Sequence, residues 1–215
     1  GAAPDGGLRP STSGFGFGAK PTTAWRKDGV AIKGGSGPDR LPGPHDTFAA
    51  YGLAWATTSN TPLRDTKQSA YEGGIRTPLI ARWPAVIETG GGLTRQPGHV
   101  IDVMATSLDA AGAEYPAEFK GRNPVPMEGK SLMPIFQGQQ RDGHDILAWN
   151  CNRGRAIRDG HWKLVRLRDD RDWDWELYDL SVDPGESNNL AQQFPDRVKT
   201  MSHDYQKWRE RVGAK

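Results

Sequence analysis

The sequence predicts a mixed α/β protein of the α+β kind, in which a small antiparallel sheet and one helix form the C-terminal end. The pair Asp159-Gly160 stands between two runs of alternating polarity, which predicts a β-hairpin. Apolar residues three or four positions apart over 198–212 predict a terminal helix. Further upstream, the apolar run 75–83, which ends at Pro84, predicts a buried strand.

The N-terminal residues give weaker signals. Glycine and proline recur throughout residues 1–45, which predicts that this stretch is largely loop. Residues 46–66 are expected to form a loop or a short helix with one buried face. The residues expected on that face are Phe48, Tyr51, Leu53 and Trp55.

Residues 100–111 predict a helix that Gly112 ends. The expected apolar stripe of this helix consists of Val100, Val103, Met104, Ser107, Leu108 and Ala111. Four prolines predict that residues 114–145 return to loop. Within it, the stretch 137–145 has the composition of a linker, so we expect a subdomain boundary there.

The C-terminal part predicts four strands and a helix. The strands are expected in the runs ILAWN, RGRAIRD, HWKLVRLR and WDWELYDL of residues 146–180. A turn is expected at 183–186, and a helix over 195–211 that begins at Pro195. The apolar stripe of that helix consists of Val198, Met201, Tyr205, Trp208 and Val212.

Composition limits the possible partners. The 215 residues include 28 Lys and Arg against 26 Asp and Glu, so the net charge of +2 gives no reason to expect a nucleic-acid or membrane partner. One cysteine rules out a disulfide within the chain. No run of about 18 apolar residues exists, so no membrane span is predicted.

Four phrases of the sequence resemble the arylsulfatase family, in the family's order and at plausible separations. They are SNTPLRDTKQSAYEGGIRTPLIARWP, HVIDVMATSLDAAGAEYP, MEGKSLMPIFQGQQR, and RAIRDGHWKLV followed by WELYDLSVDPGESNNLA. Together they span most of residues 46–191. The resemblance implies the C-terminal part of a sulfatase, whose fold is a large alkaline-phosphatase-like α/β domain followed by a small four-stranded sheet that packs on a helix. It places residues 1–138 in the tail of the large domain and residues 139–215 in the small one.

The resemblance also implies a function for Lys67. Lys67 matches the lysine that contacts sulfate in similar enzymes, and Gly73 and Gly74 would let the backbone pass close to that site. A solvated surface lysine is the alternative, and it is the usual fate of lysines. Gln68 departs from the histidine that many relatives carry, which leaves the neighbouring substrate contacts in doubt.

Similar enzymes hydrolyse sulfate esters with a formylglycine nucleophile and a divalent cation, usually calcium. The formylglycine motif and the two pairs of cation ligands are absent from this chain, so no cofactor is assigned to it. The resemblance implies that a missing N-terminal part supplies them, that a sulfate ester is the substrate, and that the chain is inactive alone. Family members of this kind imply a periplasmic or secreted location.

Some residues imitate functional motifs. Cys151 and Arg155 have the outer spacing of the formylglycine motif, but Arg153 stands where that motif needs proline or alanine. The acidic run 169–174 could bind a cation, although such runs are more often solvated hairpin tips. His99 precedes Asp102 by three residues, a spacing more typical of a local hydrogen bond at a helix start than of a metal site.

Two other functions stay open at this point. A non-catalytic module could bind a glycan or a protein partner through exposed tryptophans, and buried tryptophans would instead indicate a structural role. The candidates for such a surface are Trp149, Trp162, Trp173 and Trp175. A phosphodiesterase or phosphonate hydrolase of the same superfamily would differ from a sulfatase only in the nucleophile, which this chain lacks.

Overall fold

The structure is a computed structural model that describes residues 28–30, 33–34, 47–48, 52–151, 154–167 and 174–214. The described chain divides into two compact units, residues 78–147 and the remainder. Within the remainder, two short strands, β1 (Lys33–Gly34) and β2 (Thr47–Phe48), pair in parallel. The prediction of loop over 1–45 falls mostly outside the described residues, as do the side chains of Phe48 and Tyr51.

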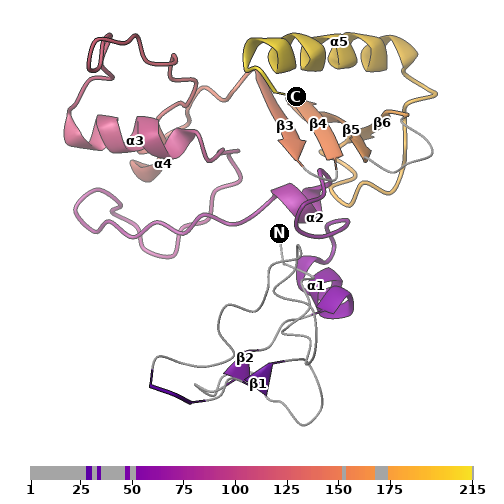
Figure 1. Cartoon of the computed structure of the whole chain (residues 1–215), viewed down its shortest axis with the longest axis horizontal. Coiled ribbons are helices and arrows are strands. Elements are labelled where there is room, and N and C mark those ends of the chain that lie inside the picture. Colours follow the sequence, from indigo (N-terminus) through magenta and orange to yellow (C-terminus); the bar gives the residue numbers. More distant parts are fainter. Residues whose placement is uncertain are drawn as a thin grey trace. The chain divides into compact units, whose positions relative to one another are not determined.

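The C-terminal sheet has four strands in the order of the sequence (Figure 1). They are β3 (Ile146–Cys151), β4 (Gly154–Asp159), β5 (Trp162–Leu167) and β6 (Glu176–Asp179). The pairs β4–β5 and β5–β6 are antiparallel. Asp159 pairs with Trp162 across the turn between β4 and β5. Gly160 in this turn has a φ of 57°, which glycine adopts readily. The predicted sheet and its hairpin are therefore confirmed.

One face of this sheet is covered by helix α5 (Pro195–Arg211), as Figure 1 shows. The register places Ile157, Leu164 and Leu177 on a common face, and all three are fully buried. Met201 and Tyr205 supply the buried face of α5. The predicted helix is confirmed, but the predicted stripe is one residue too long. Val212 lies beyond the last helical residue and is exposed.

The other face is covered by a chain segment far away in sequence. Ala70 and Tyr71 pack in one buried cluster with Ala156, Val165 and Tyr178, which project from three different strands. Tyr71 immediately precedes the short helix α2 (Glu72–Ile75). The sheet is therefore enclosed between α5 and the segment before α2, and the sequence predicted only the first of these two covers.

The described tryptophans of the sheet are packed. Trp149 lies against the Ala70 cluster, Trp162 lies with its ring centroid 5.3 Å from that of Phe194, and Trp175 lies 5.4 Å from Tyr205. All three tryptophans are half-buried, and Trp173 lies outside the described residues. Their exposure is intermediate between the exposed rings expected of a glycan-binding surface and the buried rings expected of a structural role, so the binding module stays an alternative.

Two sequence expectations about the preceding segments are wrong. Helix α1 (Gly52–Asn60) forms, but Leu53 and Trp55, expected on its buried face, are 64% and 67% exposed. The run 75–83 was expected to be a buried strand. Its first residue, Ile75, is the last residue of α2, and residues 76–83 form no strand. Ile80 in this run is 90% exposed. A strand becomes buried only when another strand or layer covers it, and the described residues provide no such cover.

The second unit contains helices α3 (Asp102–Ala111) and α4 (Met133–Phe136). Gly112 ends α3 in a left-handed conformation, with a φ of 60°, as the sequence predicted. The predicted buried stripe is wrong, because Val100, Val103 and Met104 are more than half exposed. The buried residues of α3 are instead Asp102, Ala105 and Thr106. Apart from the four residues of α4, the expected loop over 114–145 forms only an isolated bridge between Phe119 and Arg122.

Asp102 is buried at the start of α3, where its carboxylate accepts hydrogen bonds from several segments of this unit. The backbone N–H groups of His99 and Lys130 each donate to it at 2.9 Å. Arg141 Nη2 lies 2.9 Å from Oδ2, and His144 Nε2 lies 2.7 Å from Oδ1. The expected local hydrogen bond between residues 99 and 102 is confirmed, and Asp102 also ties two later segments to the helix.

We expect this unit to lose stability as the pH falls. Burial alone would raise the pKa of Asp102, but its hydrogen bonds outweigh burial and hold that pKa below the ordinary value. Burial also lowers the pKa of His99. Each group therefore binds its proton less readily in the folded state. Its contribution is fully present above the unfolded pKa, about 6.5 for His and 3.9 for Asp, and is lost as the pH falls from there through the lower folded pKa.

Urea unfolding of the chain at pH 7, 5 and 3 would measure this trend, because the lower step spans the unfolded pKa of Asp. The unfolding midpoint should fall at each step, and Asp102→Asn should flatten the lower step, because it removes the titrating carboxylate. A midpoint that stays constant, or that rises on acidification, would contradict the assignment.

Ala70 and Tyr71 lie on the N-terminal side of the division predicted at 138/139, and they pack against strands of the C-terminal sheet. The division of residues 1–138 and 139–215 into folding domains stays a prediction. Among the described residues, no helix combines the length and the apolarity needed to span a lipid bilayer.

Candidate functional site: the Lys67 loop

Lys67 lies in residues 61–71, here called the Lys67 loop, which connects α1 to α2. The Lys67 side chain is exposed, whereas its neighbour Thr66 is completely buried. Asp65 and Gln68 have φ values of 66° and 79°, in the left-handed region that few residues other than glycine adopt. The loop therefore has a specific conformation, which fixes the point from which the Lys67 side chain extends.

Two glycines let the Lys67 loop approach α2 closely. A Cβ atom on Gly73 would lie 2.2 Å from the carbonyl oxygen of Asp65 and 2.3 Å from that of Arg64. A Cβ atom on Gly74 would lie 2.2 Å from the carbonyl oxygen of Ser69. Gly73 N donates to Arg64 O at 2.8 Å, so this contact is a hydrogen-bonded one. The two glycines thus permit a close contact between α2 and the loop, and the expected approach of this backbone to a sulfate group stays a prediction.

Gly73→Ala should therefore destabilise the chain. The added methyl group would meet backbone atoms, which cannot rotate away, so we expect a loss on the order of 1–3 kcal/mol in the free energy of unfolding. Gly90→Ala is the matched control, because a Cβ there meets nothing within 4 Å. Chemical denaturation of the two variants measures the difference. Equal unfolding midpoints would show that the loop does not lie against α2.

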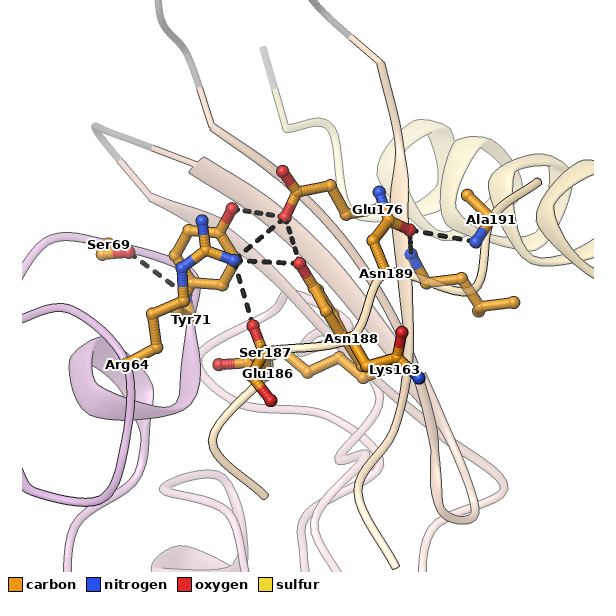
Figure 2. Close-up of polar contacts among 12 residues, drawn as sticks. Arg64, Ser69, Tyr71, Lys163, Glu176, Glu186, Ser187, Asn188, Asn189 and Ala191 are labelled. Carbon is orange, nitrogen blue, oxygen red and sulfur yellow. Dashed lines mark hydrogen bonds and ion pairs between the residues drawn. The ribbon is translucent and has the colours of Figure 1, made fainter. Parts of the chain in front are cut away.

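Arg64 connects the Lys67 loop to the sheet (Figure 2). Its Nη1 donates to Tyr178 Oη at 2.9 Å and to the carbonyl oxygen of Glu186 at 3.1 Å. The hydroxyls of Tyr71 and Tyr178 both donate to Glu176 Oε2, at 2.5 and 2.6 Å. The Arg64 guanidinium also lies over the Tyr71 ring, 4.0 Å from its centroid. Side chains from the loop and from β6, together with a backbone carbonyl of the 183–186 turn, thus form one network.

Burial and the network raise the pKa of both tyrosines above the ordinary value near 10. Burial raises the pKa of Tyr71 and of Tyr178, and the hydrogen bond to Glu176 raises each further. Both hydroxyls therefore stay hydrogen-bond donors throughout the physiological range, and the loop stays attached to the carboxylate of Glu176.

The described residues do not fit the cofactors of similar enzymes. No group of three or more His, Cys, Asp and Glu side chains in the described part of the chain could hold a metal ion. Cys151 is half-buried at the end of β3, and its Sγ donates to the carbonyl oxygen of Gly154 at 3.2 Å. This is the environment of a structural strand cysteine. The acidic run 169–174 lies outside the described residues except for Asp174.

Local sequence patterns did not point to Arg64, Glu176 and Tyr178, which attach the Lys67 loop to the sheet. One signal was present for Lys163, which shares the inward face of β5 with Val165 and Leu167. A lysine at an inward position of a strand needs a buried acidic partner. Its partner Glu72 is 91 positions away in the sequence, so no local pattern could have identified it.

Comparisons with known proteins identify the family of this chain. Residues 65–211 match the family described as N-sulphoglucosamine sulphohydrolase, C-terminal. An uncharacterized sulfatase of Schizosaccharomyces pombe is 35% identical over 163 residues, which cover 74% of this chain and 29% of that protein. The N-acetylgalactosamine-6-O-sulfatase of Bacteroides thetaiotaomicron is 31% identical over 160 residues, 66% of this chain and 30% of the enzyme. The chain thus spans under a third of the length of these relatives.

Solved structures show the same relation. A Bacteroides thetaiotaomicron structure from work on the metabolism of multiple glycosaminoglycans matches with a TM-score of 0.50 and 26% identity, over 67% of this chain and 31% of that one. The protein Ps i-CgsB, solved with k-i-k-neocarrahexaose, matches with a TM-score of 0.54 over 69% of this chain and 32% of its own. At 23% identity, it supports the fold alone. The chain therefore belongs to the sulfatase family. It corresponds to the C-terminal part of a sulfatase and contains the domain described as N-sulphoglucosamine sulphohydrolase, C-terminal.

Proposed function

We propose that this chain is the C-terminal segment of an arylsulfatase-like sulfuric ester hydrolase and that it contributes Lys67 as a contact to the sulfate group. The observation that supports this role most directly is the Lys67 loop itself. The exposed residue Lys67 extends from a backbone that Gly73, Gly74 and Arg64 hold in one conformation. A surface lysine without a function needs no such support.

The chemistry of a sulfate ester explains the use of such a lysine. The sulfuryl group is anionic, and negative charge grows on the leaving oxygen as the ester bond breaks. A cation that is already in position stabilises that charge without having to reorganise, which contributes strongly to catalysis in a site shielded from water. Lys67 cannot attack sulfur while it is protonated, so its role is binding and charge stabilisation.

The nucleophile and the cation ligands belong to the proposed N-terminal part. In similar enzymes a bound calcium ion polarises the sulfate, and a formylglycine supplies the nucleophile. The described residues fit neither group, so this chain's own share of the reaction is the lysine and the platform that carries it. The lysine and the nucleophile must then meet at one sulfate group, which makes the N-terminal part an obligate partner.

Exposed apolar residues in the 78–147 unit support the proposal that this chain binds an N-terminal part of the enzyme. The run 75–83 has the pattern of a buried strand, and Leu79 and Ile80 in it are exposed. Val100, Val103 and Met104 form a second exposed apolar group at the start of α3. Both patterns are typical of residues that another layer covers. Export to the periplasm or out of the cell is proposed on the family resemblance alone.

The test compares ester classes in the full-length enzyme that contains this segment. We expect a higher kcat/KM for p-nitrophenyl sulfate than for bis-p-nitrophenyl phosphate or a p-nitrophenyl phosphonate. Turnover of the phosphorus esters without turnover of the sulfate would instead support the phosphodiesterase or phosphonate hydrolase of the same superfamily.

A further inference from the structure

A buried ionic triad lies beneath α2, on the sheet face that the Lys67 loop covers. Lys163 Nζ lies 2.9 Å from Glu72 Oε1 and 2.7 Å from Glu186 Oε1. Glu186 Oε2 accepts a hydrogen bond from Glu72 N at 2.6 Å. Lys163 and Glu186 are fully buried, and Glu72 is 4% exposed. The triad therefore joins β5, the 183–186 turn and α2 in a site that is buried from water. Figure 2 shows Lys163 and Glu186 next to the Arg64 network.

Stability alone does not explain three ionisable groups in this position. Removing a lysine and two carboxylates from water costs several kcal/mol per ion, and well-packed apolar residues are often as stabilising as a buried ion pair. The hydrogen bonds of the triad, from Lys163 Nζ to Glu72 Oε1 and from Glu72 N to Glu186 Oε2, are directional, which apolar contacts are not. The triad therefore defines the position of α2 more sharply than apolar packing would.

The position of α2 determines the position of the Lys67 loop. Glu72 is the first residue of α2 and is followed directly by Gly73 and Gly74, against which the carbonyl groups of the loop lie. The turn residue Glu186 also accepts from Arg64 through its carbonyl oxygen, so the same turn contacts the loop from a second side. A displacement of Glu72 would be transmitted through rigid backbone contacts to residues 64–69.

We infer that Lys163, with Glu72 and Glu186, is a positioning device that sets Lys67 at the sulfate group. Lys163 does not touch the substrate and acts only through the Lys67 loop. This inference rests on the proposed role of Lys67. Loss of the Lys163 charge leaves two carboxylates facing each other in a dry site, where they repel or take up a proton. Either response shifts α2, and a displacement of about 1 Å can cost about 10²-fold in rate.

The test is a double-mutant cycle in the full-length sulfatase that contains this segment. The variants are Lys163→Met, Lys67→Ala and the pair together, with Lys207→Met as a matched control, because Lys207 is an exposed lysine of α5. We expect Lys163→Met to lower kcat about tenfold or more with little change in KM, because a displaced cation loses transition-state stabilisation. In the Lys67→Ala background, the same change should lower kcat less than about twofold.

Thermal unfolding separates positioning from general damage. The melting temperature should fall equally on Lys163→Met in both backgrounds, while the effect on kcat should disappear in the second. Equal fold-losses of kcat in both backgrounds would overturn the inference. A Lys67→Ala variant with wild-type activity would instead overturn the proposed function. If Lys163→Met fails to fold, Glu186→Gln replaces it in the same cycle, since it removes one charge and keeps an oxygen for Glu72 N.

Discussion

The 215-residue chain alone should not hydrolyse aryl sulfates, with or without added calcium. Its described residues hold neither a cluster able to bind a cation nor a cysteine in the setting of an activated nucleophile. Removing the nucleophile of an enzyme can cost on the order of 10⁶-fold in turnover, and the charge-stabilising groups left behind supply only residual acceleration. We therefore expect p-nitrophenyl sulfate turnover at the level of the blank.

The measurement is a spectrophotometric assay of the purified chain beside the full-length enzyme at equal molarity. The comparison needs chain that is folded, which the circular dichroism of the β3–β6 sheet and α5 can verify. Activity that rises in proportion to the concentration of the pure chain would contradict the division of roles proposed for the two parts.

Lys67→Ala in the full-length enzyme should lower turnover by about 10²-fold or more. The substitution removes a cation directed at the sulfate oxygens, an effect similar in kind to deleting one donor of an oxyanion hole. The loop itself should keep its conformation, because Arg64 and Gly73 hold it through their own hydrogen bonds and Thr66 is completely buried.

A matched control uses another exposed lysine of the same chain. Lys207→Ala removes an exposed charge on α5 and should leave kcat and KM unchanged. Steady-state kinetics of the two variants, with the wild type, then separate a specific role from a general effect of net charge. A Lys67→Ala enzyme with wild-type turnover would show that Lys67 is an ordinary surface lysine.

Local patterns predicted the C-terminal sheet and helix correctly. The hairpin at Asp159-Gly160 and the end of α3 at Gly112 depend on residues a few positions apart, and both form as expected. The alternation of β5 likewise determines which of its residues face inward. Signals of this kind are complete within a short segment of sequence.

Predictions of burial failed where the cover lies elsewhere. Apolar periodicity reports that a residue is buried in the whole fold and does not say by what. Val103 and Ile80 have the expected patterns, yet the described residues leave both exposed. The attachment of the Lys67 loop to the sheet was equally out of reach, because Arg64 and Tyr178 are 114 positions apart. Long-range polar contacts follow from the fold and leave no local pattern.

The most direct test of the role of Lys67 is a crystal structure of the full-length enzyme with sulfate bound at its catalytic centre. The account predicts that Lys67 Nζ lies within about 2.7–3.2 Å of a sulfate oxygen, the range of a direct hydrogen bond. It also predicts that the Lys67 loop keeps its contacts with Gly73 and Gly74 in that structure. A well-ordered sulfate with Lys67 directed into solvent, away from every sulfate oxygen, would contradict the account.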